Sequence, residues 1–130
     1  TDKAIADFHA EFFAGDEVDY PMIEEINALR PQYKTALLSN AWDNLREALT
    51  KKWEIDYAFD ELFISAEMGV AKPDPEIYKK GLEKLALPPQ AAVFVDDFIE
   101  NIEAARKLGM HGIHFQEKAQ AMRELRALLT

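Results

Sequence analysis

A chain of 130 residues is long enough for one domain with a substantial core, and its 48% hydrophobic and 30% charged residues are typical of a globular protein. The net charge of −9 disfavours nucleic acid and anionic membranes as partners, and the lack of cysteine excludes disulfides, thiol nucleophiles and cysteine–zinc sites. No apolar run has membrane-spanning length and no signal-peptide pattern opens the sequence, so we expect a cytoplasmic protein.

The periodicity of apolar residues predicts helices and strands that alternate along most of the chain. Because strands that alternate with helices pair in parallel through right-handed crossovers, we expect an α/β fold with a parallel sheet. The two most apolar segments should be strands that are covered on both faces. Helices are expected over residues 3–14, 21–29, 42–52, 75–86, 98–108 and 117–129, and strands over 34–39, 62–65, 91–95 and 112–115.

Two adjacent carboxylates, Asp96 and Asp97, follow the apolar strand 91–95 and precede a helical pattern. That order places them at the carboxyl end of a parallel strand, where open α/β sheets bind ligands. The two carboxylates repel each other there, and a hard divalent cation would relieve the repulsion. The alternative is a strand that merely ends in an Asp-rich turn before a helix. Asn101, one helical turn after Asp97, either hydrogen-bonds back to this acidic loop or is an exposed helix residue.

Two further loops carry polar residues in positions suited to binding. Ser39 and Asn40 end the apolar strand 34–39, where a hydroxyl and main-chain N–H groups can hold a phosphoryl oxygen. Either residue could instead cap the next helix. Lys72 precedes Pro73, which excludes Lys72 from the α region of backbone conformation. Most loop lysines are solvated, but one held this rigidly suits a cation that is needed at a defined point.

The order and spacing of strand–Ser-Asn, Lys-Pro and strand–Asp-Asp resemble the haloacid dehalogenase (HAD) superfamily, from about Tyr20 to Thr130. The segment LLSNA is similar to that family's second motif, GVAKPDPEIY to its third and VFVDDFIENIEAARKLGM to its fourth. The resemblance implies a Rossmann-like core with helices on both faces of the sheet, Mg²⁺, and an aspartate nucleophile that takes a phosphoryl or acyl group. It implies that the catalytic residues of this chain are Ser39, Asn40 and Lys72. Ser39 would hydrogen-bond the transferred group, and Lys72 would neutralise the nucleophile and the phosphate. Asp96 would ligate Mg²⁺, and Asp97 would support it.

The family's first motif, Asp-x-Asp-x-Thr/Val on an N-terminal strand, has no match in the chain. We therefore interpret residues 1–20 as the remnant of a helical cap and residues 21–130 as the C-terminal part of the core domain, with the nucleophile outside the chain. In this family the nucleophile strand is central, so strands 34–39 and 91–95 should not pair with each other. A second chain or another N-terminal segment should fill the slot between them. The chain alone should be inactive, with an incomplete Mg²⁺ site.

The motifs are most similar to phosphatases of the glucose-1-phosphatase and epoxide-hydrolase N-terminal-domain kind, which implies a small phosphorylated metabolite as substrate. True 2-haloacid dehalogenases tend to have Ser-Ser-Asn where this chain has Val-Asp-Asp. Displacing a halide leaves no phosphoryl dianion, so it needs neither Mg²⁺ nor a carboxylate pair. The acidic pair thus favours a Mg²⁺-dependent phosphomonoesterase with an aspartyl-phosphate intermediate over a dehalogenase-like hydrolase. A third hypothesis is a non-catalytic short form that serves as a binding or assembly module.

Overall fold

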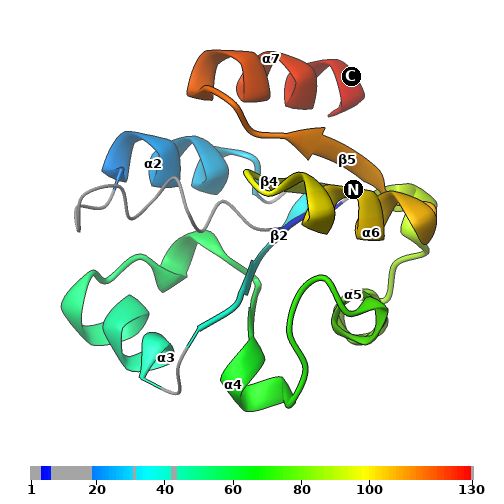
Figure 1. Ribbon diagram of the computed structural model, residues 1–130. Helices are drawn as coiled ribbons and strands as arrows, with labels where there is room; N and C mark the ends of the chain where they lie inside the picture. The colour runs from blue at the N-terminus through cyan, green and yellow to red at the C-terminus, as the bar shows by residue number, and fades with distance from the viewer. Residues whose placement is uncertain (1–3, 7–18, 31, 42–43, 130) are drawn as a thin grey trace.

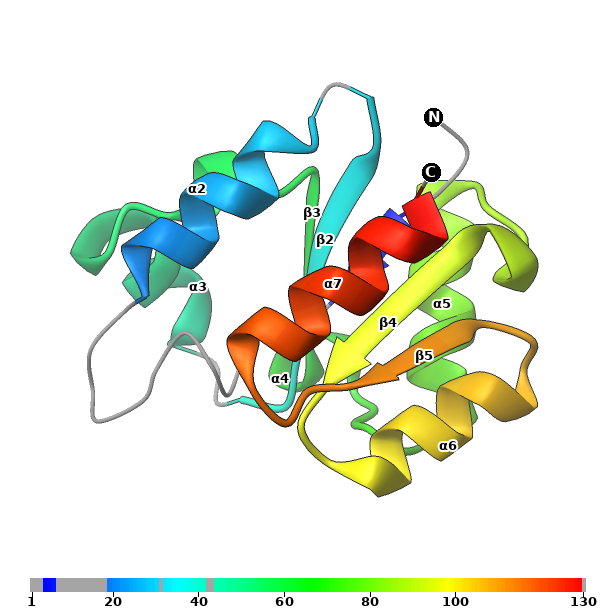
Figure 2. The same cartoon turned by 90° about the horizontal axis from the view of Figure 1, so that it is seen from above.

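The computed structural model describes residues 4–6, 19–30, 32–41 and 44–129. Its centre is a five-stranded sheet in the order β3-β2-β1-β4-β5, and all neighbouring strands run parallel (Figures 1 and 2). The fold class expected from the sequence is therefore confirmed. The strands are β1 (Ala4–Ala6), β2 (Lys34–Ser39), β3 (Glu61–Ile64), β4 (Ala92–Asp96) and β5 (His111–His114).

Helices connect the strands and cover the sheet on both faces. Within the described ranges, none of them combines the length and the apolar character needed to cross a membrane. The α-helices are α2 (Tyr20–Ala28), α3 (Leu45–Glu47), α4 (Ser65–Met68), α5 (Pro75–Leu85), α6 (Ile99–Lys107) and α7 (Lys118–Leu129). A π-helix, η2 (Ala48–Lys52), continues α3, and two short 3-10 helices are η3 (Asp56–Ala58) and η4 (Pro89–Ala91).

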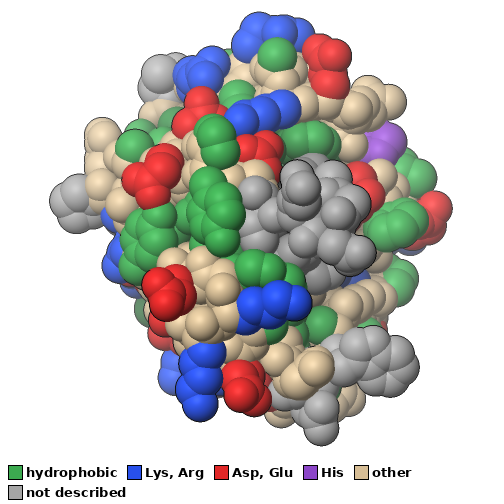
Figure 3. All heavy atoms as spheres, turned by 90° about the vertical axis from the view of Figure 1, so that its left-hand side faces the viewer, with side chains coloured by type: hydrophobic (Ala, Val, Ile, Leu, Met, Phe, Trp, Pro, Cys, Tyr) green, Lys and Arg blue, Asp and Glu red, His purple; other side chains and the backbone are tan. Residues whose placement is uncertain are grey.

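Each face of the sheet has its own apolar core, because side chains alternate between the two faces of a strand. On β4, Val93 and Val95 contribute to one core, while Phe94 contributes to the other. Helices α2, α3 and α7 pack on the first face, and α5 and α6 on the second (Figure 2). On the surface, acidic and basic side chains are interspersed with apolar ones on the face shown in Figure 3.

The central strand corrects one expectation from the sequence. Instead of a helix, Ala4–Ala6 form a strand that pairs with β2 on one side and β4 on the other. The rest of the expected helix, residues 7–14, lies outside the described residues. Extended backbone at Ala4–Ala6 satisfies main-chain groups of both neighbours, and such tertiary pairing overrides a local helical pattern.

The same strand changes the account of the central slot. Strands β2 and β4 do not pair with each other, as predicted, because β1 lies between them. The expectation that the central strand is absent and must come from a second chain or another segment is wrong for this structure, since the chain's own residues occupy the position. The division into residues 1–20 and 21–130 stays a prediction, although Ala4–Ala6 belong to the core sheet.

The start of α5 is set by its sequence, and it fixes the loop that carries Lys72. Asp74 accepts a hydrogen bond from the N–H of Glu76 at 2.9 Å, and Pro75 occupies the first turn of the helix. An aspartate N-cap followed by proline is a strong signal for a helix start. The helix therefore begins at a defined residue, three positions after Lys72.

Candidate functional site

A buried ion pair lies at the carboxyl end of the sheet. Nζ of Lys72 is 2.9 Å from Oδ2 of Asp96, and the two side chains are only 5% and 4% exposed. Lys72 comes from the loop before α5, and Asp96 is the last residue of β4. The structure thus brings together two residues that the sequence places in one site. A charge pair this far from water persists only if further hydrogen bonds satisfy both partners.

Asp96 has those additional partners. The side-chain amide of Asn101 donates to the same Oδ2 at 3.0 Å, and the main-chain N–H of Phe98 donates to Oδ1 at 3.1 Å. Asn101 is buried, so it is not the exposed helix residue that the sequence also allowed. Instead, its side chain hydrogen-bonds back to the acidic loop. Burial raises the pKa of Asp96, but the charge of Lys72 and the hydrogen bonds to the carboxylate outweigh it and lower the pKa to about 2.

Asp97 is held differently from its neighbour. Oδ1 of its carboxylate is buried and has no hydrogen-bond partner among the described residues. Burial and the adjacent Asp96 carboxylate raise the pKa of Asp97 to about 6. Its main-chain oxygen lies 2.9 Å from Nε2 of His114 at the end of β5. Among the described residues, nothing therefore prevents Oδ1 of Asp97 from accepting a cation or a proton, while the contact with His114 fixes the main chain of the loop.

Ser39 supplies a second unpaired polar atom at the same edge of the sheet. It is the last residue of β2, it is 0% exposed, and its Oγ has no hydrogen-bond partner among the described residues. The alternative role of helix cap does not apply to Ser39 or Asn40, because the residue at the N-cap of α3 is Asn44. Buried hydroxyls are normally paired, so the Ser39 hydroxyl, which has no partner among the described residues, could donate a hydrogen bond to a ligand oxygen at this edge of the sheet.

Asn40 binds the main chain of Lys72. Its side-chain amide donates to the Lys72 carbonyl at 3.0 Å and accepts from the Lys72 N–H at 2.8 Å. The next residue, Ala41, makes a similar pair of bonds with the hydroxyl of Ser65, at 2.9 and 3.1 Å. Both ends of the Asn40 amide are thus occupied. In this arrangement Asn40 positions the lysine loop, whose Lys72–Pro73 peptide bond is cis.

The residues present fit a magnesium ion in part. Asp96 and Asp97 offer hard carboxylate oxygens, as Mg²⁺ prefers, and Oδ1 of Asp97 lacks another partner among the described residues. Within the part of the chain that the structure describes, no group of three or more His, Cys, Asp or Glu side chains could hold a metal. A complete site would therefore need ligands besides these two carboxylates.

Three residues around the site were not identified from the sequence. Phe94 places its ring under Nζ of Lys72, Tyr78 contacts both Phe94 and Asn101, and His114 holds the acidic loop. The only sequence signal was position: Phe94 lies two residues before Asp96, and Tyr78 follows Lys72 by six. Phe98, directly after the acidic pair, is 59% exposed at the site's edge rather than part of the core.

Comparison with known proteins places these features in a family. A family model described as haloacid dehalogenase-like hydrolase matches residues 1–109. Bifunctional epoxide hydrolase 2 of the rat (Rattus norvegicus) is 33% identical over 127 residues, covering 94% of this chain and 23% of that protein. D-ribitol-5-phosphate phosphatase of Bacteroides thetaiotaomicron is 29% identical over 120 residues, covering 88% of this chain and 58% of that protein. The chain thus spans about a quarter and somewhat over half of these two relatives.

Solved structures agree. An uncharacterised protein from Corynebacterium glutamicum superposes with a TM-score of 0.82 at 27% identity, over 98% of this chain and 93% of that one. A HAD family enzyme from Bacteroides thetaiotaomicron, crystallised with magnesium and inorganic phosphate, gives a TM-score of 0.70 at 28% identity, over 78% of this chain and 55% of that one. With the family model matching most of its length, the chain belongs to the haloacid dehalogenase-like hydrolases.

Proposed function

We propose that this chain is the C-terminal part of a Mg²⁺-dependent phosphomonoesterase that acts on a small phosphorylated metabolite through an aspartyl-phosphate intermediate. The nucleophilic aspartate would come from a segment outside the chain. One observation carries the proposal: a buried Lys72–Asp96 pair lies at the same sheet edge as two buried oxygens, Ser39 Oγ and Asp97 Oδ1, that have no partner among the described residues. A bound phosphate could supply the missing partner of Ser39 Oγ, and its cation could supply that of Asp97 Oδ1.

The chemistry divides among the chain's residues as follows. Ser39 would donate its hydroxyl to an oxygen of the transferred phosphoryl group, and Lys72 would offset the negative charge of that group and of the nucleophile. Asp96 and Asp97 would hold Mg²⁺, which supplies charge neutralisation at the phosphoryl oxygens. Asn101 would fix the Asp96 carboxylate, and Asn40 would fix the loop of Lys72 through its main chain.

The proposed reaction has two steps, formation of the aspartyl phosphate and its hydrolysis. A carboxylate oxygen of the nucleophile forms a bond to phosphorus while the bond from phosphorus to the ester oxygen breaks, and the departing alkoxide takes up a proton from water. Water then attacks the acyl phosphate and returns a free carboxylate and inorganic phosphate. The relatives that support this reaction include a phosphatase of a sugar-alcohol phosphate and an enzyme crystallised with magnesium and phosphate. The acidic pair disfavours the dehalogenase-like alternative, which has no dianion to neutralise.

The test begins with the gene. The reading frame should continue upstream of Thr1 and encode an apolar strand that ends in Asp-x-Asp. The extended protein should hydrolyse p-nitrophenyl phosphate in the presence of Mg²⁺. Asp96→Asn in that protein should lower turnover by orders of magnitude per folded molecule. A frame that starts at or just before Thr1, or near-normal turnover by the variant, would contradict the proposal.

A second function is favoured by two observations. The chain's own Ala4–Ala6 complete the middle of the sheet, and the solved Corynebacterium glutamicum chain is matched over 93% of its own span. Both support a short form that folds as a non-catalytic binding or assembly module. Sedimentation and thermal unfolding of the 130-residue chain test this second function. A monodisperse protein that unfolds cooperatively and has no phosphatase activity would favour it. An unfolded or aggregated chain would oppose it.

A further inference from the structure

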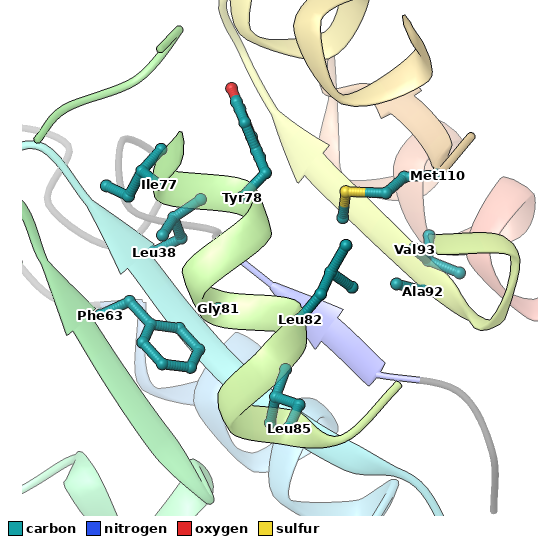
Figure 4. A pocket seen from close by; sticks show the side chains of 10 residues that line it. All are labelled: Leu38, Phe63, Ile77, Tyr78, Gly81, Leu82, Leu85, Ala92, Val93 and Met110. Carbon is teal, nitrogen blue, oxygen red and sulfur yellow. The ribbon is translucent and has the colours of Figure 1, made fainter. Parts of the chain in front are cut away.

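Tyr78 is buried in the second core, yet its hydroxyl has a specific partner. The residue is 2% exposed, and its phenol donates to the main-chain oxygen of Asn101 at 2.9 Å. Figure 4 shows the side chain rising from the first part of α5, with the hydroxyl directed away from the apolar side chains that line the neighbouring cavity. A buried phenol oxygen requires such a partner, and this one belongs to the helix that carries the amide bonded to Asp96.

The ring of Tyr78 reaches the other side of the same ion pair. It meets the ring of Phe94 edge to face, with centroids 5.2 Å apart and planes at 90°. Phe94 in turn presents its ring to Nζ of Lys72, which lies 5.6 Å from the ring centroid. A cation over an aromatic face is attracted by the ring's negative face, most strongly where water is excluded.

These contacts form a closed circuit of five buried residues. Lys72 and Asn101 both donate to Oδ2 of Asp96. Tyr78 contacts Phe94, whose ring lies under the Lys72 ammonium, and it also donates to the main-chain oxygen of Asn101. We infer that Tyr78 is a positioning residue that directs the Lys72 ammonium and the Asn101 amide onto the same oxygen of Asp96. The inference rests on the proposed function only in calling the pair part of a catalytic site.

A purely structural role for Tyr78 predicts something different. In that case loss of the hydroxyl would lower the free energy of unfolding and leave the order of the ion pair in the folded state unchanged. The chain offers a matched control, because Tyr33 also donates its phenol to a main-chain oxygen, that of Leu129 at the end of α7, at 2.6 Å. Tyr33 takes no part in the circuit.

The experiment compares Tyr78→Phe with Tyr33→Phe in the 130-residue chain. Competitive labelling with acetic anhydride, read by mass spectrometry, measures how fast each lysine amine becomes accessible. Lys79, whose side chain is 56% exposed, serves as the internal reference. Losing one hydrogen bond should raise the relative labelling of Lys72 by roughly threefold to tenfold in Tyr78→Phe and leave it unchanged in Tyr33→Phe. Equal Lys72 labelling in the two variants would overturn the inference.

A second variant separates the two arms of the circuit. Phe94→Leu removes the aromatic face and keeps an apolar side chain, so it should raise the labelling of Lys72. Hydrogen exchange of the Asn101 side-chain amide, followed by NMR, should quicken in Tyr78→Phe and stay at the wild-type rate in Phe94→Leu. Lys72 labelling that is unchanged in Phe94→Leu would remove the aromatic contact from the inference. None of these measurements needs turnover, so their failure and the failure of the proposed phosphatase are distinguishable.

Discussion

Lys72 and Asp96 are 24 residues apart in sequence, yet Nζ of one lies 2.9 Å from Oδ2 of the other in a nearly dry environment. An ion pair of this kind is costly to break from one side, because the partner is left as an uncompensated buried charge. The pair adds little to the net free energy of folding, because both charges lose their hydration when they are buried. Its value lies in the fixed position that it gives to an ammonium group at the sheet edge.

Lys72→Met should therefore destabilise the chain by about 3 kcal/mol or more, measured by urea unfolding at neutral pH. The double variant Lys72→Met with Asp96→Asn should recover part of that loss, because neither remaining side chain carries a buried charge. Lys79→Met is the control: its pair with Glu76 is more than half exposed and should matter little. A single variant that is as stable as wild type would show that the pair opens freely to water.

Stability should depend on pH in opposite ways through the two adjacent aspartates. The pKa of Asp96 is lowered from 3.8 to about 2, so its contribution is complete above pH 4 and is lost as the pH falls toward 2. The pKa of Asp97 is raised from 3.8 to about 6, so the folded state binds its proton more tightly. Asp97 should therefore cost stability as the pH rises from about 4 to 6.

Asp97→Asn tests this assignment. The variant should gain stability relative to wild type as the pH rises through that window, and the two proteins should differ least near pH 4. Urea midpoints collected at intervals between pH 4 and 8 give the comparison. Parallel pH profiles for the two proteins would mean that the Asp97 carboxyl titrates as it does in the unfolded chain.

The sequence located the parts of the fold that local chemistry determines. The predicted strand 34–39 is β2, and the predicted helix 75–86 differs from α5 by one residue, because Asp74 and Pro75 specify where that helix begins. The meeting of Lys72 with Asp96 followed from parallel topology, which gathers strand ends at one edge. The functional roles of the site residues stay predictions.

The remaining features depend on packing that no local pattern encodes. Ala4–Ala6 have apolar neighbours at helical spacing, and only pairing with β2 and β4 makes them a strand. Tyr78 reaches Asn101 because α5 and α6 lie side by side on one face of the sheet. His114 reaches the Asp97 carbonyl because β5 pairs with β4 in a register that aligns His114 with Asp96.

Mg²⁺ should bind the 130-residue chain only weakly. Two carboxylates are available among the described residues, and one of them already accepts hydrogen bonds from Lys72, Asn101 and the Phe98 N–H. Isothermal calorimetry should detect no tight one-to-one binding of Mg²⁺. In an NMR titration with Mg²⁺, the resonances of Asp97 should shift more than those of surface acids such as Glu103. Asp97→Asn should abolish that selective shift. Tight one-to-one binding to the isolated chain would mean that it holds a full ligand set.

Ile5→Pro should strongly destabilise the chain. Proline lacks an N–H, and in a central strand every N–H points at one of the two neighbouring strands, here β2 or β4. Each main-chain group left buried without a partner costs roughly 1–3 kcal/mol, a large share of the about 5–15 kcal/mol that stabilises a domain. Lys118→Pro is the matched control, because the first residue of α7 tolerates proline. Thermal unfolding of the two variants gives the comparison.

The position of β1 should also accept a longer strand. Residues Ala4–Ala6 align with Lys34–Ala36 of β2 and with Ala92–Phe94 of β4, and both neighbouring strands continue beyond that overlap to Ser39 and Asp96. An apolar peptide of about seven residues ending in Asp-x-Asp could pair along the full length of both, with its carboxylates at the edge that holds Lys72. Such a peptide should raise the melting temperature of Ile5→Pro more than that of wild type, whose own strand competes for the position. A peptide of similar composition with proline at its centre should raise the melting temperature of neither protein. If the Asp-x-Asp peptide stabilises neither protein, the central position is specific to Ala4–Ala6, and a nucleophile delivered on a strand from outside the chain would lose its support.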